Sequence, residues 1–335
     1  MLLLDLDKYD NSNGSHEEEI VFNALSDSFW PGPLTIIALA SSLIPMLVTA
    51  GTGYVGVRVP SHPLALSLLK ECQLPIAAPS ANRFGHVSPT RAQHVIDDLG
   101  DKGVRVLNGD EKIHEKATCN LGIESTVARI SGADKYVHIF RQGGITKQQI
   151  EKVIESLGLG WRVDVVSRTV TMKHTSTTST SSGSNNNNNN ETIGQEAPGQ
   201  AITHYAPDIP TYIISSFEID NHDTTTTNDT TTKKIITSSD LASIVVIDFG
   251  SKMKSLETYC LAYKDLSSSS SAKEGANRLF DTLRWAESCS GATQVFLPTI
   301  NNNINNNDND LSDGLTDRIL RAGSGIFIDI IVVVS

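Results

Sequence analysis

The order of apolar and polar positions along the chain predicts helices alternating with strands. Apolar side chains recur at helical spacing in Glu17–Ser28, and Leu34–Leu39 is an Ile-rich stretch of strand length with no glycine or proline to break it. Pro63–Cys72 is amphipathic and begins with proline, which suits the first turn of a helix. Further strands are expected at Val55–Val59, Val104–Leu107, Ser125–Ile130 and Val137–Phe140, and a further helix at Thr146–Leu157. Because these elements do not follow a strict repeat, we expect an α/β fold with a mixed, twisted sheet.

The second half of the chain has the same kind of alternation. The expected strands are Ile209–Ser215, Ile244–Phe249 and Gln294–Leu297, and the expected helices are Ala272–Glu287 and Leu315–Arg321. This order predicts a second, smaller domain of the doubly wound, Rossmann-like kind. None of these strands is followed by Gly-x-Gly-x-x-Gly, so we do not expect dinucleotide binding.

Polar tracts interrupt this pattern. Residues Thr175–Asn190 are almost entirely Ser, Thr and Asn, and such a segment cannot bury enough apolar surface to be ordered. Similar tracts lie at Asn221–Thr232, Ser267–Ser271 and Asn301–Asp310, where we expect insertions in surface loops. The predicted organisation is therefore a first domain at residues 1–165, a low-complexity segment and linker at 166–207, and a small second domain at 208–335.

The charge of the chain limits its partners. Asp and Glu number 38 against 27 Lys and Arg, which gives a net charge of −11. An acidic chain is a poor match for the continuous phosphates of a nucleic acid, although a small basic pocket remains compatible with it. No apolar run reaches the ~20 residues that cross a bilayer, so we expect no membrane partner. The start, Met1-Leu2-Leu3-Leu4, is followed at once by Asp5 and is unlike a signal peptide.

The cysteines lack the spacing of a metal site. They lie at Cys72, Cys119, Cys260 and Cys289, with no Cys-x-x-Cys pair. Scattered cysteines in a chain of 335 residues are typical of reduced, buried thiols, and they favour a cytoplasmic protein. We expect no zinc and no other protein-bound metal.

The most informative segment is the small polar loop Pro79–Thr90. It follows the apolar stretch Leu74–Ala78 and precedes a helical pattern at Arg91–Leu99. Ser88 is placed to cap that helix, with Pro89 at its first position. A strand, a polar loop and a helix start form an anion site, because free N–H groups and the helix dipole point at it. The alternative is an ordinary capped loop.

Other motifs decide between these alternatives. They are Phe-Trp-Pro-Gly-Pro-Leu-Thr at Phe29–Thr35, Val-Arg-Val-Pro-Ser-His-Pro at Val57–Pro63, Gly-Ile-Glu-Ser-Thr-Val at Gly122–Val127, Arg-Gln-Gly-Gly at Arg141–Gly144 and His-Tyr-Ala-Pro at His204–Pro207. In this order and spacing the chain resembles the threonylcarbamoyl-AMP synthases, the YrdC-like family, in its long two-domain form.

The resemblance implies a reaction. Members of the family join L-threonine, bicarbonate and ATP, with Mg²⁺, into threonylcarbamoyl-AMP and pyrophosphate. The product supplies N6-threonylcarbamoyladenosine in tRNA through a downstream threonylcarbamoyl transferase complex. Adenylyl transfer depends mainly on positioning and charge neutralisation, so we assign no catalytic nucleophile. Direct binding of tRNA, or of double-stranded RNA in general, stays open.

The resemblance also assigns binding residues. The threonine positions are Arg58, Ala78 through its backbone, and Ser125. A guanidinium at Arg58 suits a carboxylate because it can bind both oxygens. The ATP positions are Tyr54, Ser80, Asn82, Ser88, Arg141 and Tyr205. Tyr54 stands where the family has a small hydroxyl residue, so we expect that contact to be lost or remade.

One departure concerns the start of the chain. Members of the family open with Thr-Tyr-Gly-Leu and Lys-x-Arg-Pro motifs, and Leu2–Asn23 contains neither. We therefore expect an N-terminally incomplete first domain and weaker neutralisation of the triphosphate. The alternative function is a non-catalytic or truncated member that acts as a nucleotide- or RNA-binding module.

Overall fold

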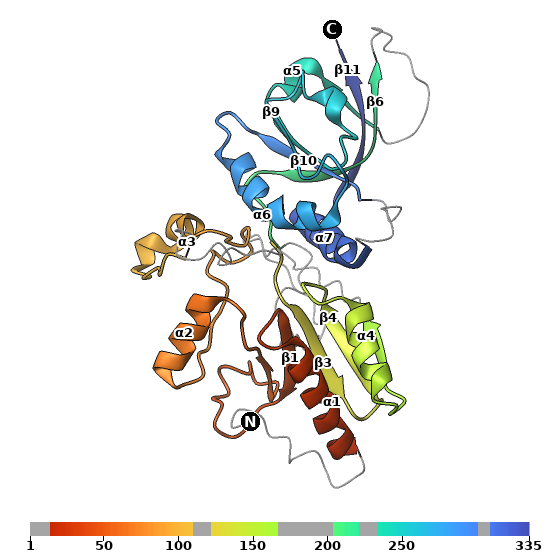
Figure 1. Cartoon of the computed structure of the whole chain (residues 1–335). Coiled ribbons are helices and arrows are strands. Elements are labelled where there is room, and N and C mark those ends of the chain that lie inside the picture. Colours follow the sequence, from red (N-terminus) through yellow and green to blue (C-terminus); the bar gives the residue numbers. More distant parts are fainter. Residues whose placement is uncertain (1–13, 110–121, 167–203, 221–232, 301–308, 335) are drawn as a thin grey trace, which may run out of the picture.

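The chain forms two α/β bodies, each built on its own sheet (Figure 1). A computed structural model describes residues 14–109, 122–166, 204–220, 233–300 and 309–334. The first sheet is five-stranded and the second is six-stranded. The prediction of a mixed α/β fold with a second, Rossmann-like domain is confirmed.

The first sheet mixes parallel and antiparallel pairs. Its strands are β1 (Leu34–Leu39), β2 (Tyr54–Val57), β3 (Thr126–Ser131), β4 (Tyr136–Arg141) and β5 (Arg162–Val165). Their order is β2-β1-β3-β4-β5. The pairs β1/β3 and β4/β5 are parallel, whereas β1/β2 and β3/β4 are antiparallel. Because β4 runs back along β3, the last residue of β4 lies beside the first residues of β3.

Two helices cover one face of this sheet. They are α1 (Gly14–Phe29) and α4 (Lys147–Ser156), and Leu25 and Ile150 pack into a core with strand residues such as Ile36 and Ile139. The Thr146 hydroxyl accepts a hydrogen bond from the Gln149 backbone amide, and the Gln149 side-chain oxygen accepts one from the Thr146 backbone amide. This reciprocal cap starts α4 where the sequence predicts it.

The segment between β2 and β3 differs from the prediction. It contains α2 (Pro63–Cys72), α3 (Ala92–Leu99) and the short helix η2 (Gly100–Lys102). The expected strands Leu74–Ala78 and Val104–Leu107 are wrong, because both stretches lie outside regular structure. Leu74 is 68% exposed and Leu107 is 71% exposed. Short apolar runs become strands only where a neighbouring strand pairs with them, and neither run has such a neighbour within the described residues.

The second sheet is parallel throughout. Its strands are β6 (Thr211–Asp220), β7 (Lys234–Thr237), β8 (Ile244–Asp248), β9 (Ala262–Asp265), β10 (Gln294–Pro298) and β11 (Phe327–Val333), in the order β7-β11-β6-β10-β8-β9. The helical segments are α5 (Ser238–Leu241), η3 (Lys254–Leu256), α6 (Ala272–Ser288) and α7 (Asn309–Ala322). Apolar clusters cover both faces of the sheet, as a parallel sheet requires. Figure 1 shows α6 and α7 on the side that faces the first domain.

One polar tract is part of the folded structure. Ser267 is fully buried, and its hydroxyl donates to Glu274 at 2.6 Å and accepts from the Ser271 amide at 2.9 Å. The Ser271 side chain in turn caps α6. The prediction of a surface loop holds for Ser268 and Ser269, which are exposed. Ser267 is buried instead, because it and Ser271 satisfy free amides at the start of α6. The other tracts lie outside the described residues, apart from the start of α7.

The described cysteines are free thiols. Cys72 is exposed at the end of α2, so the prediction of buried thiols is wrong there, whereas Cys260 and Cys289 are partly buried. Cys119 lies outside the described residues. Among the helices that the structure describes, none has the length and apolar character that a membrane crossing requires.

Candidate functional site

Ser125 and Arg141 meet at the junction of β1, β3 and β4. The Arg141 guanidinium donates from Nε and Nη2 to the Ser125 carbonyl at 3.1 and 3.0 Å, and Nη2 also lies 3.1 Å from the Ser125 hydroxyl. Thr35 of β1 contacts the same hydroxyl at 2.8 Å. Two residues that the resemblance places in different subsites, threonine and ATP, therefore share one hydrogen-bond network.

Gly143 lets the chain turn tightly against this network. A Cβ atom at Gly143 would lie 2.4 Å from the Glu124 carbonyl oxygen and 2.5 Å from the Thr126 nitrogen. The Gly144 amide donates to the same carbonyl at 3.1 Å. The Thr126 hydroxyl then accepts from the Ile145 amide at 3.0 Å. Only glycine permits this approach, so the Arg-Gln-Gly-Gly motif has a steric reason.

Glu124 binds groups from both domains. Its Oε1 accepts from the Ser88 hydroxyl at 2.7 Å, and its Oε2 accepts from Nε of Arg318 on α7 at 3.1 Å. Burial alone would raise the pKa of Glu124. The charges of Arg318 and Arg141 and the Ser88 hydrogen bond outweigh burial and hold that pKa at about 2. The carboxylate is therefore ionised at neutral pH.

Arg318 extends from the second domain into this cluster. Its side chain is 0% exposed, and Nη1 donates to the Gln142 carbonyl at 2.6 Å and to Asp317 at 3.0 Å. Burial would lower the pKa of Arg318, but Tyr205, Glu124 and Asp317 raise it overall. Sequence reasoning missed both Glu124 and Arg318. The available signal was an arginine at a buried position of an amphipathic helix, which requires a partner.

Tyr205 is buried between the domains. It is 0% exposed and packs against Phe280 of α6 with 5.2 Å between ring centroids. The Arg318 guanidinium carbon lies 5.5 Å from the centre of the Tyr205 ring. Burial raises the pKa of the Tyr205 hydroxyl. The structure therefore places this linker residue beside the cluster of Glu124 and Arg318.

The Pro79–Thr90 loop is built differently from the prediction. Helix α3 begins at Ala92, and its N-cap residue is Arg91, which makes no side-chain cap. Ser88 therefore does not cap α3 and Pro89 is not its first residue, so the capping geometry expected at that helix start is wrong. The contact of Ser88 with ATP stays a prediction. The Ser88 hydroxyl donates to the charged carboxylate of Glu124, and such charge-assisted hydrogen bonds are stronger than neutral ones.

Asn82 holds this loop together from inside. It is 9% exposed, and its Nδ2 donates to the Arg83 carbonyl at 2.8 Å and to the His86 carbonyl at 3.0 Å. These bonds close the turn that carries Ser88. They give Asn82 a structural role, and its contact with ATP stays a prediction.

The remaining predicted residues are more open. Ala78 and Ser80 are exposed and lie outside regular structure, and Arg58 is exposed just after β2. Tyr54 is in β2, with the Arg129 guanidinium 5.1 Å from its ring centre. Their roles in binding threonine and ATP stay predictions.

A second polar cluster connects the domains beside the first. His86 is 6% exposed, and its Nδ1 lies 3.0 Å from Asp98 while its Nε2 lies 3.0 Å from Glu287 of α6. The ligand atoms of His86, Asp208 and Glu287 lie within 4.8 Å of one another, which a metal ion could use. The same atoms already form hydrogen bonds, since the Asp208 amide also donates to Glu287. We assign this cluster to domain contact.

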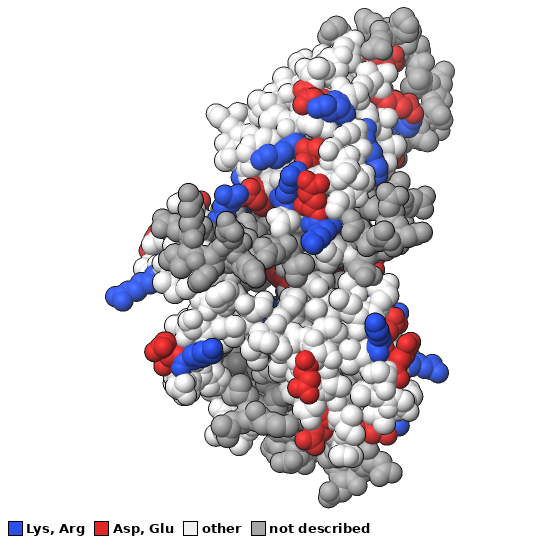
Figure 2. Space-filling view, in the orientation of Figure 1, with Lys and Arg blue, Asp and Glu red and all other residues white. Residues whose placement is uncertain are grey.

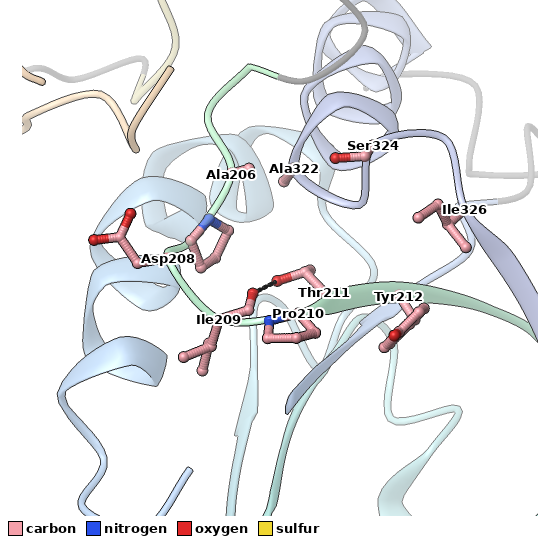
Figure 3. A pocket seen from close by; sticks show the side chains of 10 residues that line it. Ala206, Asp208, Ile209, Pro210, Thr211, Tyr212, Ala322, Ser324 and Ile326 are labelled. Carbon is pink, nitrogen blue, oxygen red and sulfur yellow. Dashed lines mark hydrogen bonds between the residues drawn. The ribbon is translucent and has the colours of Figure 1, made fainter. Parts of the chain in front are cut away.

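A cavity of about 310 Å³ lies where the linker enters the second domain (Figure 3). It is lined by residues 206–212 with Ala322, Ser324 and Ile326. Its one charged lining residue, Asp208, forms an ion pair with Arg83 at 2.7 Å. The cavity is mainly apolar, and no Lys or Arg is among its lining residues. It shares no lining residue with the Ser125–Arg141 network, so the two are separate sites.

The fold and the buried interdomain site define a two-domain α/β protein whose linker enters a charged cluster. Residues 5–143 match the Sua5/YciO/YrdC family model, described as telomere recombination, and residues 145–324 match the model of the threonylcarbamoyl-AMP synthase C-terminal domain. The second match alone covers more than half of the chain. The chain therefore belongs to the two-domain Sua5 family of threonylcarbamoyl-AMP synthases.

Individual relatives agree. The chain is 37% identical over 213 residues to the threonylcarbamoyl-AMP synthase of Bacillus subtilis, covering 63% of this chain and 51% of the relative. It is 33% identical over 190 residues to that of Pyrococcus abyssi, covering 57% and 46%. The chain thus spans about half the length of these curated relatives. A crystal structure of P. abyssi Sua5 complexed with L-threonine matches with a TM-score of 0.63 and 24% identity, covering 94% of this chain and 76% of that one.

Proposed function

We propose that this protein is an L-threonylcarbamoyladenylate synthase. The threonine amine takes up bicarbonate with loss of water, and the resulting carbamate oxygen attacks the α-phosphorus of ATP. The bond from the α-phosphorus to the bridging oxygen breaks, and pyrophosphate leaves. The product would serve a downstream threonylcarbamoyl transferase complex in tRNA modification.

One observation supports this proposal most. Arg141 is oriented by the Ser125 carbonyl and hydroxyl at the strand junction, and Ser88 lies next to it through Glu124. A fixed guanidinium beside a hydroxyl group suits the developing charge of an adenylyl transfer. Family membership and the threonine complex of the P. abyssi relative support threonine as the second substrate.

Mg²⁺ would enter with ATP. The carboxylate nearest to Ser88 and Arg141 is Glu124, and it is already paired with Arg318. A magnesium ion in such a site is held mainly by phosphate oxygens and water. Arg141 and Ser125 then orient the phosphates and the carbamate, and the Tyr205 linker excludes water from the intermediate.

The alternative is a non-catalytic nucleotide- or RNA-binding module. On the face shown in Figure 2, Lys and Arg side chains lie close to Asp and Glu side chains of the described residues. This interspersed charge and the net charge of −11 disfavour a broad RNA surface. The proposal therefore keeps the enzymatic function, in the cytoplasm, ahead of this alternative.

The test is release of pyrophosphate from ATP. We expect release only when both L-threonine and bicarbonate are present, together with a threonine-containing adenylate detected by mass spectrometry. Arg141→Ala should abolish release. ATP binding without any release in the complete mixture would favour the non-catalytic module.

A further inference from the structure

Arg318, from the second domain, has one guanidinium nitrogen that no described residue of the protein uses as a hydrogen-bond donor. A guanidinium carries five N–H donors. Nε bonds Glu124, and Nη1 bonds the Gln142 carbonyl and Asp317. Nη2 is buried and has no hydrogen-bond partner among the described residues. A buried charged donor without a partner is costly, typically by about 1–3 kcal/mol or more, so it indicates a missing acceptor.

Two further groups in the same place lack a partner. They are the Tyr205 hydroxyl, in a fully buried side chain, and the Nδ1 atom of His204, again within the part of the chain described. The Tyr205 ring lies 5.5 Å from the Arg318 guanidinium carbon and 4.0 Å, between centroids, from the His204 ring. Three polar groups without a partner among the described residues therefore lie where the end of the linker meets α7.

The charges nearby favour an anion. Arg318 and Arg141 both act on Glu124, whereas Asp317 is shared between Arg318 and Arg321. In these contacts the three guanidinium groups of Arg141, Arg318 and Arg321 therefore face only the two carboxylates of Glu124 and Asp317. An anionic oxygen would accept from Nη2 of Arg318 and from the Tyr205 hydroxyl at once.

We propose that Arg318 binds a phosphate oxygen of the nucleotide, so that the second domain completes the ATP site of the first. This inference rests on the proposed function, because the anion is identified as ATP through Ser88 and Arg141. A threonine carboxylate offers the same chemistry, and the experiment distinguishes the two sources. Arg318 and Tyr205 are buried, so a phosphate bound there would be shielded from solvent as well.

The experiment measures binding of pyrophosphate, ATP, adenosine and L-threonine by calorimetry in the full chain. Arg318→Met should weaken pyrophosphate and ATP affinity by about ten- to a hundredfold and leave adenosine affinity unchanged. Arg318→Lys keeps the positive charge beside Glu124 but loses the several N–H donors of the planar guanidinium, so it should also weaken the affinity for ATP. If Arg318→Met does not fold, the ATP affinity of Arg318→Lys tests the proposal in its place. Arg321→Met removes a charge from the same helix and should change ATP affinity less than threefold.

Glu124→Gln separates ligand binding from domain anchoring. If Arg318 binds phosphate, removing the neighbouring negative charge should leave ATP affinity equal or higher. If Arg318 only anchors Glu124, Glu124→Gln and Arg318→Met should weaken every ligand alike, which would overturn the inference. A selective loss of threonine affinity in Arg318→Met would also overturn the inference, because it would show that Arg318 binds the threonine carboxylate and not a phosphate.

Failure of the proposed function has a different signature. Arg318-dependent pyrophosphate binding without threonine-dependent turnover would retain the anion site and reject the synthase. Turnover with ATP affinity unchanged in Arg318→Met and Arg318→Lys would retain the synthase and reject the anion site. Wild-type protein that binds neither pyrophosphate nor ATP would reject both.

Discussion

Arg284 of the second domain forms a buried ion pair with Asp98 of the first. Nη2 of Arg284 lies 2.8 Å from Oδ2 of Asp98, and their side chains are 9% and 3% exposed. Arg284 also donates to the Val87 carbonyl, and Asp98 accepts from His86. These bonds join α6 to the loop that carries Ser88, so they connect the domain interface to the site.

Arg284→Met should destabilise the protein strongly. It leaves the Asp98 carboxylate buried without its main partner, and breaking a buried pair in this way typically costs about 3–5 kcal/mol. Thermal and urea unfolding measure the change. Arg278→Met, on the same helix, removes an exposed pair with Glu274 and should cost less than about 1 kcal/mol. Equal losses in the two variants would contradict a structural role for the Arg284–Asp98 pair.

His86 should make stability depend on pH. Burial would lower its pKa, but hydrogen bonds to Glu287 and Asp98 raise that pKa overall. A raised pKa stabilises the fold fully below the unfolded value of about 6.5, and this contribution disappears as pH rises through the higher folded value. The difference in unfolding free energy between wild type and His86→Gln should therefore shrink above about pH 6.5.

The comparison with the variant is necessary because other histidines act in the opposite direction. Burial lowers the pKa of His94 and of His204, so each favours the folded state at higher pH. Subtracting the His86→Gln curve removes their contribution. A difference that is constant from pH 5 to 9 would show that His86 does not change its charge on unfolding.

Gly143→Ala should disrupt the site from the backbone. Its Cβ would approach the Glu124 carbonyl oxygen to 2.4 Å, so the backbone that leads into β3 has to move. We expect loss of ATP binding and lower stability, measured by calorimetry and thermal unfolding. Gly100→Ala is the control, because its Cβ would meet Ile96 at an ordinary 3.5 Å. Normal ATP affinity in Gly143→Ala would show that the turn tolerates a shift.

Arg58→Ala should remove threonine binding while the fold survives. Arg58 is exposed after β2, and substitutions of exposed residues usually change stability little. The lost charged hydrogen bonds correspond to about 1.5–3 kcal/mol of binding free energy. Calorimetry with L-threonine measures this, and Arg162→Ala, exposed on β5, is the matched control. Unchanged threonine affinity with reduced stability would make Arg58 a structural residue.

The sequence alone determined the elements that carry strong local signals. Periodic apolar positions and caps located α1, α2, α4 and α6 to within a few residues. It missed β5, β7, β9 and β11, and it predicted strands at Leu74–Ala78 and Val104–Leu107. A short strand exists only through its neighbours, and pairing between distant segments leaves little trace in a local pattern.

The candidate site divides in the same way. Ser125 directly precedes β3 and Arg141 ends β4 of the same hairpin, so motifs close in sequence brought them together. Glu124 and Arg318 are 194 positions apart and belong to different domains. Only the packing of α7 against the first domain decided that they meet. The physical reason is that a local sequence pattern shows which face of an element is buried. The partner of a buried charge depends on which residues of the other domain pack against that face, and the local pattern does not contain this information.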